Sequence, residues 1–249
     1  MHPSKNFNAV VLHRVIDGNP VDFIDIDLNS LRFILSKSEL NFLSIDKAFE
    51  NKYQERPNIC LTFDDGFSSD YDLVLPELKK INATATFFIV TDFLDTAGYL
   101  TTEQVKTLSE SGMQIGSHSK SHPNFLTLSA TERIEELRDS KAILEVITGK
   151  EVTIFSFPFG FYDHECVQAV FSAGYSICCT SKHGISSKLD FVVPRNSINA
   201  KTSINRLDKI LNANLTQRWS WYIEDIIKSI LKRYFPRFYI SIRNLFSNL

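Results

Sequence analysis

Two adjacent carboxylates, Asp64 and Asp65, follow an apolar run in the stretch CLTFDDGFSSDYD (60–72). Placing both at the end of a buried strand costs free energy, because the two charges repel each other and each loses water. A divalent metal ion would offset that cost, since one carboxylate can ligate the ion while its neighbour handles a proton. The pair therefore predicts metal-assisted chemistry, with an ordinary turn or a phosphate-linked magnesium site as the alternatives.

Two histidines four residues apart, His118 and His122, follow a second apolar run in GSHSKSHPNF (116–125). In one turn of helix or in a tight loop, this spacing places both imidazoles on the same side, as in many zinc sites. Taken alone, such a pair is more often part of a surface helix. Together with one carboxylate, it would leave positions on a metal ion open for water and substrate. The sequence has no Gly-rich phosphate loop with Lys and Ser/Thr, which counts against a nucleotide–magnesium site.

The elements that must position these residues alternate between short β-branched or aromatic runs and helical patterns, which predicts an α/β fold with a mostly parallel sheet. Strands are predicted at 8–13, 58–63, 84–90, 113–118, 152–158, 175–180 and 191–195. Helices are predicted at 27–38, 71–81, 101–112 and 129–149, the last with a capping box (Ser129, Glu132) and a stop at Gly149. Since the aspartate pair and the histidine pair both follow predicted strands, they should meet at the carboxyl edge of the sheet, where α/β folds place their active sites.

Three segments in this order resemble the first three motifs of the polysaccharide deacetylase family, whose shared unit is the NodB homology domain: TFDDG (62–66), HSKSH (118–122) and FPFG (157–160). The resemblance covers roughly residues 7–200. It implies an irregular, mostly parallel (β/α)7-type barrel. It also implies that the protein removes acyl groups, mostly N-acetyl groups, from amino sugars by metal-assisted hydrolysis.

The resemblance assigns roles to the matched residues. Asp64 would be the general base, and Asp65, His118 and His122 would hold the metal ion. Zinc is the metal expected, with cobalt, nickel or iron as alternatives.

The third motif departs from the family pattern, which usually has Arg two residues before its Pro and Tyr after it. Ser156 and Phe159 stand at those positions. The backbone N–H of Phe159 could still donate to the oxyanion of the reaction. Arg195 could neutralise Asp64 in place of the missing Arg, or it could be a surface cation at a strand end.

The usual C-terminal Leu-x-x-His motif, which supplies the general acid, is also missing, since no histidine follows His183. In a permuted subgroup of the family, this histidine comes from the first strand, in a motif like Leu-x-Tyr-His. The segment VVLHRV (10–15) is similar to that motif and nominates His13 as the acid, the alternative being a core histidine. The helical stretch at 27–50 and VPRNSI (193–198) also resemble the subgroup.

The predictions for other polar and aromatic residues near the motifs are less specific. His183 is predicted in a loop near the top of the barrel, where it could contact substrate. Asp163 is predicted to cap a helix. Several aromatic residues that follow the motif strands could form a sugar-stacking rim or fill the core: Phe67, Phe93, Phe125, Phe161 and Tyr162.

The C-terminal segment differs from the rest of the chain. We predict a deacetylase-like domain at 1–216 and a basic amphipathic helical tail at 217–249. From Arg218 onward there are six basic residues and two acids, whereas the whole chain of 249 residues has a formal charge of -2. The tail could pack on the barrel, form a dimer contact or rest on an anionic membrane surface. The overall charge gives no reason to expect nucleic acid as a partner.

The expected compartment follows from the cysteines and the N-terminal residues. The four cysteines lack paired spacing, and the opening residues lack a signal-type apolar run, so we expect a cytoplasmic protein, with peripheral contact to the inner membrane face as an option. The expected substrate is an N-acetylated amino sugar, as a sugar nucleotide or lipid-linked glycan intermediate of O-antigen or capsule assembly. The alternatives are a non-catalytic carbohydrate-binding or assembly protein, and a deacylase for formyl or O-acetyl groups.

Overall fold

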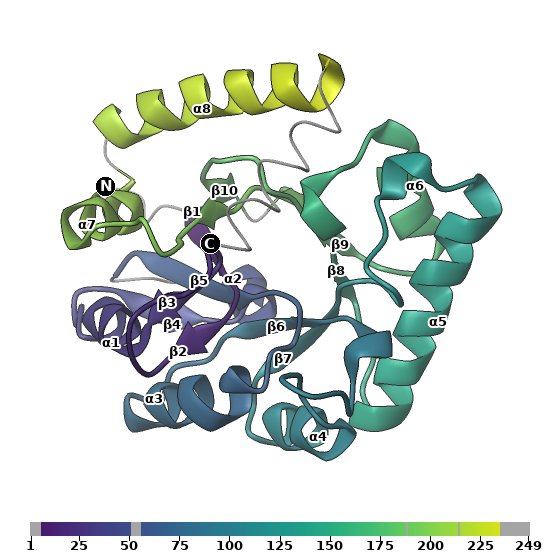
Figure 1. Cartoon of the computed structure of the whole chain (residues 1–249), viewed down its shortest axis with the longest axis horizontal. Helices are drawn as coiled ribbons and strands as arrows, with labels where there is room; N and C mark the ends of the chain where they lie inside the picture. Colours follow the sequence, from purple (N-terminus) through teal and green to yellow (C-terminus); the bar gives the residue numbers. More distant parts are fainter. Residues whose placement is uncertain (1–5, 51–55, 188, 214, 235–249) are drawn as a thin grey trace.

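The computed structural model describes residues 6–50, 56–187, 189–213 and 215–234. Within them, ten strands form one mostly parallel, nearly closed barrel with helices around it (Figure 1). These strands are β1 (Asn6–Leu12), β4 (Asn41–Leu43), β5 (Asn58–Phe63), β6 (Thr86–Ile89), β7 (Gln114–Ser117), β8 (Ile154–Ser156), β9 (Ile177–Cys179), β10 (Ser186–Ser187), β11 (Val192–Val193) and β12 (Asn196–Ser197). The predicted fold class is confirmed.

The strands follow one another around the barrel in the order β10-β1-β5-β6-β7-β8-β9-β11, with β4 added to β5 and β12 to β1. Only β10 pairs antiparallel in this sheet, against β1. A separate ribbon joins β2 (Val15–Ile16) to β3 (Ile26–Asp27). Every residue of β5 is buried, as expected for a parallel strand covered on both faces. Because parallel neighbours point the same way, their carboxyl ends gather at one end of the barrel.

The described helices lie mainly on the outside of the barrel (Figure 1). They are α1 (Leu28–Leu35), α2 (Ile45–Glu50), α3 (Leu75–Lys80), α4 (Thr102–Glu110), α5 (Ala130–Thr148), α6 (His164–Ser172), α7 (Ile204–Asn212) and α8 (Leu215–Tyr234). The predicted caps of α5 are present, since Ser129 and Glu132 form a capping box and Gly149 adopts a left-handed conformation. Asp163 caps α6 as predicted. The helix predicted at 71–81 instead starts with a π-helical turn, Asp70–Val74, and continues as α3.

In Figure 1, α8 runs along the top of the molecule and α7 lies below its N-terminal end, where Arg206 of α7 contacts Glu224 of α8. Helix α8 begins at Leu215, two residues before the predicted tail at 217–249, and Trp221 is 3% exposed. None of the described helices is long and apolar enough to cross a membrane. Residues 235–249 of the predicted tail lie outside the described residues, and the division of the chain at 216 stays a prediction.

Candidate active site

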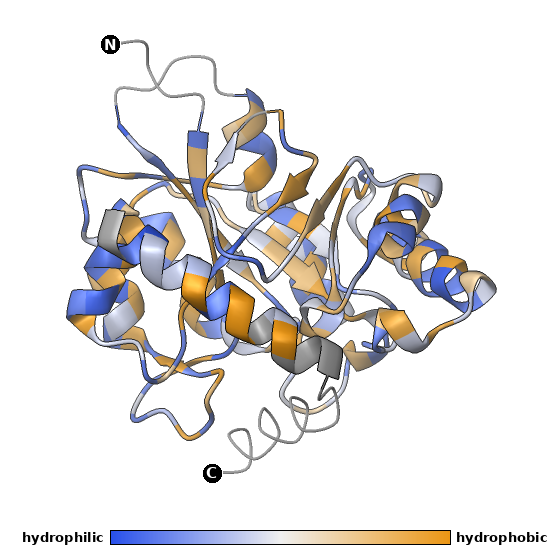
Figure 2. Cartoon of the chain, turned by 90° about the horizontal axis from the view of Figure 1, so that it is seen from above, coloured by the Kyte–Doolittle hydropathy of each residue, from blue (hydrophilic) through white to orange (hydrophobic). Residues whose placement is uncertain are grey.

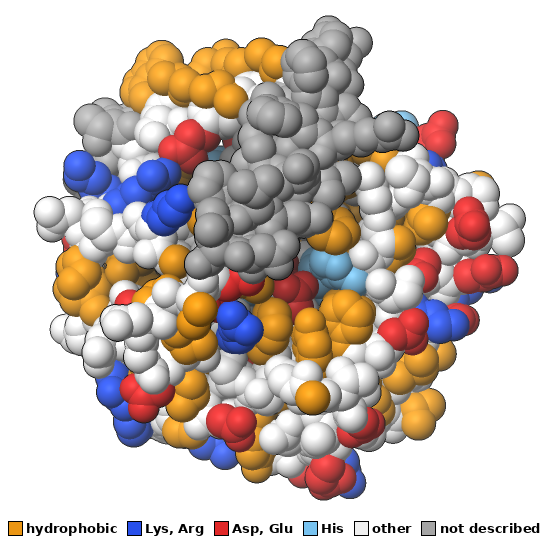
Figure 3. Space-filling model, viewed as in Figure 1, with side chains coloured by type: hydrophobic (Ala, Val, Ile, Leu, Met, Phe, Trp, Pro, Cys, Tyr) orange, Lys and Arg blue, Asp and Glu red, His pale blue; other side chains and the backbone are white. Residues whose placement is uncertain are grey.

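The seven residues nominated from the sequence come from five strand ends at one end of the barrel. His13 follows β1, Asp64 and Asp65 follow β5, His118 and His122 follow β7, Phe159 follows β8, and Arg195 follows β11. Figure 3 shows histidine atoms beside carboxylate atoms near the middle of this face, framed by apolar side chains. The structure thus brings together residues that are up to 182 positions apart in the chain, from His13 to Arg195.

Asp64 and Arg195 form a buried, two-pronged ion pair. The guanidinium donates from Nη1 to Oδ1 at 2.6 Å and from Nη2 to Oδ2 at 2.7 Å. Nη2 also donates to the Ser156 hydroxyl at 2.7 Å, and Nη1 donates to Thr62. Of the two alternatives for Arg195, the structure therefore shows the contact with Asp64 and not a surface position. Burial opposes ionisation of Asp64, but the charges of Arg195 and His118 hold its pKa below the usual value.

Asp65, His118 and His122 converge on one point beside this pair. Asp65 Oδ1 lies 3.4 Å from Nε2 of each histidine, and one ligand atom from each residue lies within 4.8 Å of the others. The side chains are 14%, 3% and 13% exposed. Although burial raises the pKa of Asp65, a hydrogen bond from His118 and the charges of His13 and His122 bring it far below the usual range.

A hydrogen bond to the Ser156 backbone orients the ring of His118. Its Nδ1 lies 2.8 Å from the carbonyl oxygen of Ser156, and since a carbonyl only accepts, Nδ1 carries the proton. Nε2 is therefore the ring nitrogen that faces Asp65, and in the neutral ring it is the nitrogen whose lone pair a metal ion would take. Histidine ligands of metal ions commonly use this second hydrogen bond to a backbone carbonyl.

The two histidines are joined by the tight loop that the sequence allowed. Ser119 accepts a hydrogen bond from the His122 backbone N–H at 3.0 Å. Glu136 of α5 accepts from the backbone N–H groups of Lys120 and Ser121 at 2.9 Å each. The loop is therefore pinned to a helix, which fixes where the second imidazole points.

Backbone strain is concentrated at this site. In the described part of the chain, seven residues other than glycine have positive φ, and four of them are Asp65, Ser119, His122 and Phe159. Such conformations disfavour side chains and persist where the surrounding structure imposes them, often at active sites. Gly66 continues the turn after Asp65 with φ 75°, and a Cβ there would lie 3.3 Å from Ile89.

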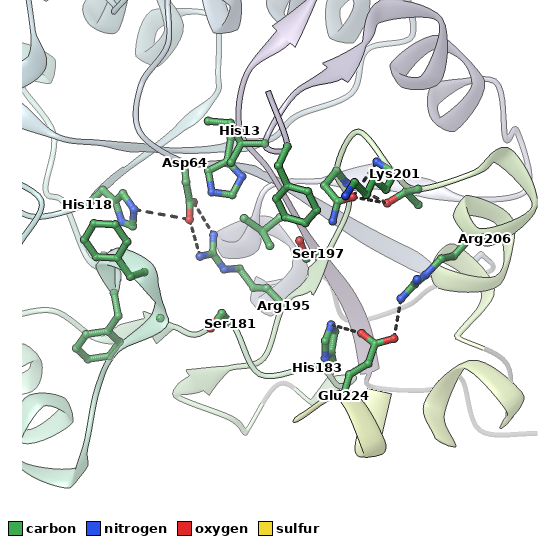
Figure 4. A pocket seen from close by; sticks show the side chains of 18 residues that line it. His13, Asp64, His118, Ser181, His183, Arg195, Ser197, Lys201, Arg206 and Glu224 are labelled. Carbon is green, nitrogen blue, oxygen red and sulfur yellow. Dashed lines mark hydrogen bonds and ion pairs between the residues drawn. The ribbon is translucent and has the colours of Figure 1, made fainter. Parts of the chain in front are cut away.

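A cavity of about 490 Å³ opens beside these residues, and His13, Asp64, His118 and Phe159 are among its lining (Figure 4). The Phe159 ring packs 4.4 Å, centroid to centroid, from His122. His13 lies close enough that its charge lowers the pKa of both Asp64 and Asp65. The volume is in the range of small-molecule pockets.

Asp70 is a buried carboxylate near the site that the sequence analysis did not identify. Its side chain is completely buried, and neither carboxylate oxygen has a hydrogen-bond partner in the described structure. Burial and the nearby charges of Asp65 and Asp64 raise its pKa well above the usual value. In FSSDYD this aspartate looks like part of a solvated helix start, so no local signal marks it.

The remaining candidates are placed differently. His183 lines the cavity, but Asp225 of α8 contacts its Nδ1 at 2.7 Å and Trp221 stacks on its ring. Of the two alternatives for the aromatic residues, the structure shows core filling for Phe125 and Phe161, which are 0% and 2% exposed. Phe67 is also buried. It stacks on Tyr99 at 5.1 Å.

The residues present fit a divalent metal ion. Two imidazole nitrogens and one carboxylate oxygen form a donor set typical of zinc and of neighbouring transition metals. The three atoms already face one point, and His118 has the supporting hydrogen bond expected of a ligand.

Comparison with known proteins identifies the family. Residues 51–178, just over half of the chain, match the family model described as polysaccharide deacetylase. The chain belongs to the polysaccharide deacetylase family. The predicted resemblance is confirmed at this level, whereas membership of the permuted subgroup stays a prediction.

Members of this family are similar to the chain in sequence and in fold. It is 30% identical over 139 residues to YxkH of Bacillus subtilis, a match covering 56% of this chain and 50% of YxkH. It is 31% identical over 139 residues to the peptidoglycan-N-acetylmuramic acid deacetylase PdaC of B. subtilis, covering 55% of this chain and 29% of PdaC. The fold matches the Streptococcus pyogenes deacetylase PplD in complex with acetate with a TM-score of 0.74 at 22% identity, over 83% of this chain and 98% of PplD. The chain thus spans half the length or less of these curated relatives.

Proposed function

We propose that this protein is a metal-dependent hydrolase that removes an N-acetyl group from an amino sugar. The observation that carries the proposal is the convergence of Asp65, His118 and His122 next to an ionised aspartate held by Arg195. Membership of the family supports a hydrolase acting on amide bonds of carbohydrates. The three converging residues would hold a divalent ion, with zinc expected and cobalt, nickel or iron as alternatives; when bound, the ion polarises the amide carbonyl and lowers the pKa of water toward ~7.

Asp64 acts as the general base. Its Oδ2 lies 3.8 Å from His118 Nε2, so the carboxylate borders the proposed ion-binding position. Arg195 and Ser156 fix its orientation, and the depressed pKa keeps it ionised and able to accept a proton from the attacking water.

His13 and Phe159 complete the reaction from the other strands that border the cavity. The backbone N–H of Phe159 donates to the negative charge that develops on the amide oxygen. His13, as an imidazolium, gives its proton to the leaving nitrogen, and the C–N bond then breaks to release acetate and the free amine.

The substrate we infer is an amino sugar carried as a sugar nucleotide or a lipid-linked glycan intermediate in surface polysaccharide assembly. The expected location is the cytoplasm or the inner membrane face. Helix α8 supports the membrane option, because six of its apolar side chains are at least 41% exposed: Trp219, Tyr222, Ile223, Ile226, Ile227 and Ile230. Figure 2 shows that apolar residues recur along α8, and Figure 3 shows apolar side chains along the upper edge of the molecule, where α8 lies in Figure 1.

The charges of α8 fit an anionic bilayer as the occupant of this face. Its two acids, Glu224 and Asp225, turn toward the body of the protein, where they contact Arg206 at 2.7 Å and His183 at 2.7 Å. The other charged residues of the helix sequence are basic. An interfacial helix with an apolar face and basic residues binds such surfaces.

Acetate release from a panel of acylated sugars tests the proposed function. The panel holds N-acetyl, N-formyl and O-acetyl amino sugars, each free, linked to a nucleotide or linked to a lipid. We expect acetate from one N-acetyl substrate with the wild type and with His164→Ala, an exposed histidine outside the site. Zinc binding without release of any acyl group would instead favour a carbohydrate-binding or assembly protein, and release of formate or ester acetate would favour the other deacylases.

A further inference from the structure

The cavity of the candidate active site continues along the segment of chain that follows Arg195. Arg195, Ser197 and Asn199 line the cavity, whereas Asn196 and Ile198 between them are 0% and 1% exposed. This alternation is that of an extended chain, in which every second side chain lies on the same face. Ser197 and Asn199 therefore continue the cavity wall that begins at Arg195, the partner of the proposed base.

The two polar side chains of this wall carry groups that bind hydroxyls. Figure 4 shows Ser197 between Asp64 and Lys201. A serine hydroxyl both donates and accepts hydrogen bonds. Asn199 Oδ1 accepts from the Lys201 backbone N–H at 3.0 Å. That contact uses the oxygen of the amide, and a ligand in the cavity can accept from its NH2 group.

An aromatic ring borders the same segment. Phe23 lies in the loop between β2 and β3, lines the cavity, and accepts at its carbonyl oxygen from the Ala200 backbone N–H at 3.2 Å. Lys201 Nζ lies 5.8 Å from the centre of its ring. The loop is also held at its end, because the buried Asp25 carboxylate accepts from Arg14 Nε at 2.7 Å and Nη2 at 3.1 Å. The aromatic ring is thus held beside the polar wall.

A pyranose ring has the same two kinds of surface. Its C–H groups form apolar faces that pack on an aromatic ring, whose own faces carry partial negative charge. Its hydroxyl groups donate and accept hydrogen bonds around the edge, which suits a serine hydroxyl and an asparagine amide. Small-molecule sites commonly combine an aromatic lining with a few polar groups that fix orientation.

We propose that Phe23, Ser197 and Asn199 bind the pyranose ring of the amino sugar whose amide lies at the metal site. This proposal rests on the proposed deacetylase function and deepens it, because it assigns recognition of the sugar to residues outside the first three motifs of the family. An acetamide without a sugar ring would reach the metal site but would not contact this wall. The substrate class is therefore N-acetyl pyranosides and not acetamides in general.

Kinetics on neutral N-acetyl pyranosides test the assignment. The substrates are the methyl glycosides of N-acetylglucosamine, N-acetylgalactosamine and N-acetylmannosamine. Phe23→Leu keeps apolar bulk but removes the ring, and we expect KM to rise about 10-fold with little change in kcat, because stacking stabilises the bound substrate and the transition state alike. Ser197→Ala should raise KM about 3- to 10-fold, as for loss of one hydrogen bond. Phe23→Tyr keeps an aromatic ring and should lose less than Phe23→Leu.

Two controls show that the metal site and the fold are intact. Phe191→Ala removes a 61% exposed phenylalanine that is not part of the described cavity lining, and it should behave as the wild type. Acetohydroxamic acid binds zinc and has no sugar ring, so it should bind the zinc-loaded wild type and variants with equal affinity. An unchanged KM in Phe23→Leu, or acetohydroxamate binding weakened as much as the glycoside, would overturn the proposal.

A binding measurement separates this proposal from the proposed function. Saturation-transfer NMR measures binding of the three glycosides to metal-free protein, and we expect Phe23→Leu to weaken it about 5-fold or more. Weakened binding in a protein that releases no acyl group from any sugar would refute the deacetylase and leave the sugar site. Acetate release with the same KM in wild type, Phe23→Leu and Ser197→Ala would refute the sugar site alone. Absence of binding for all three glycosides would also overturn the sugar site.

Discussion

Arg195, which lies between β11 and β12, binds Asp64 with both ends of its guanidinium within 2.7 Å of the two carboxylate oxygens. The two residues come from β11 and β5, 131 positions apart in sequence. The Ser156 hydroxyl lies between them, donating to Asp64 Oδ2 at 3.3 Å and accepting from Arg195 at 2.7 Å. A serine thus occupies the motif position where the family usually has arginine, and an arginine from another strand reaches the same aspartate.

Loss of Arg195 should destabilise the protein as well as inactivate it. Arg195→Ala leaves the Asp64 carboxylate, whose side chain is 5% exposed, without its ion-pair partner. We therefore expect the free energy of unfolding to fall by about 3–5 kcal/mol. Urea denaturation of the metal-free protein measures this. Arg195→Ala combined with Asp64→Asn should regain part of the stability, because no buried charge is then left unpaired. A stability loss below about 1 kcal/mol for Arg195→Ala would contradict the importance of the pair.

An exchange of positions tests whether Arg195 orients the base. In the double variant Ser156→Arg with Arg195→Ser, we expect acetate release above that of Arg195→Ser alone, because the guanidinium can again reach Asp64. Ser156→Arg alone serves as the control, since it crowds two cations against one carboxylate. If the double variant folds but releases no more acetate than Arg195→Ser alone, an arginine at position 156 cannot replace Arg195 in orienting Asp64.

The general base and general acid should be separable from metal binding. Asp64→Asn and His13→Ala should each reduce kcat on the order of 10² to 10⁴ while the protein still binds one zinc ion per chain. Elemental analysis after dialysis gives the zinc content, and His122→Ala is the variant expected to lower it. Near-normal turnover by either Asp64→Asn or His13→Ala would remove that residue from the mechanism.

Asp70 should make stability depend on pH. Its pKa in the folded state lies above the unfolded value, so the unfolded chain releases this proton first and stability falls as the pH rises between the two pKa values. In Asp70→Asn this contribution is absent, and the free energy of unfolding should decline less from pH about 4 upward. Urea unfolding of metal-free protein at several pH values measures the slope. Asp72→Asn, on the exposed side of the same turn, is the matched control, and identical slopes for wild type and Asp70→Asn would refute the prediction.

Helix α8 should carry the contact with membranes. Ile223→Asp combined with Ile227→Asp places two charges on its exposed apolar face and should abolish sedimentation with phosphatidylglycerol vesicles at low salt. Val146→Asp, at an 84% exposed apolar site on α5, should sediment as the wild type does. If the wild type does not sediment with these vesicles, or if the double variant still does, lipid is not the partner of α8.

The fold and the position of most site residues could be predicted because both follow from local patterns. Buried runs such as NICLTF predict parallel strands, and the carboxyl ends of parallel strands meet at one end of a barrel. Residues directly after those strands, such as Asp65 and His118, therefore lie close together independently of the loop conformations. Two short strands, β4 and β12, were not predicted from the sequence because pairing with β5 and β1 defines them.

Features that depend on distant contacts could not be predicted. The burial of Asp70 results from packing around the π-helical turn, whereas its sequence neighbours are polar. The contact between His183 and Asp225 joins residues 42 positions apart, and nothing near either residue indicates it. Arg195 could be nominated only because the family arginine was missing, with a surface position as the alternative.

The most direct test of the central claim is acetate release before and after removal of metal. Wild-type protein is assayed as purified, after dialysis against a chelator, and after addition of one equivalent of zinc. We predict loss of activity on chelation and recovery with zinc for the wild type and for His164→Ala, and no recovery for Asp65→Ala. Full activity of the chelated protein, or of Asp65→Ala, would contradict a mechanism built on Asp65, His118 and His122.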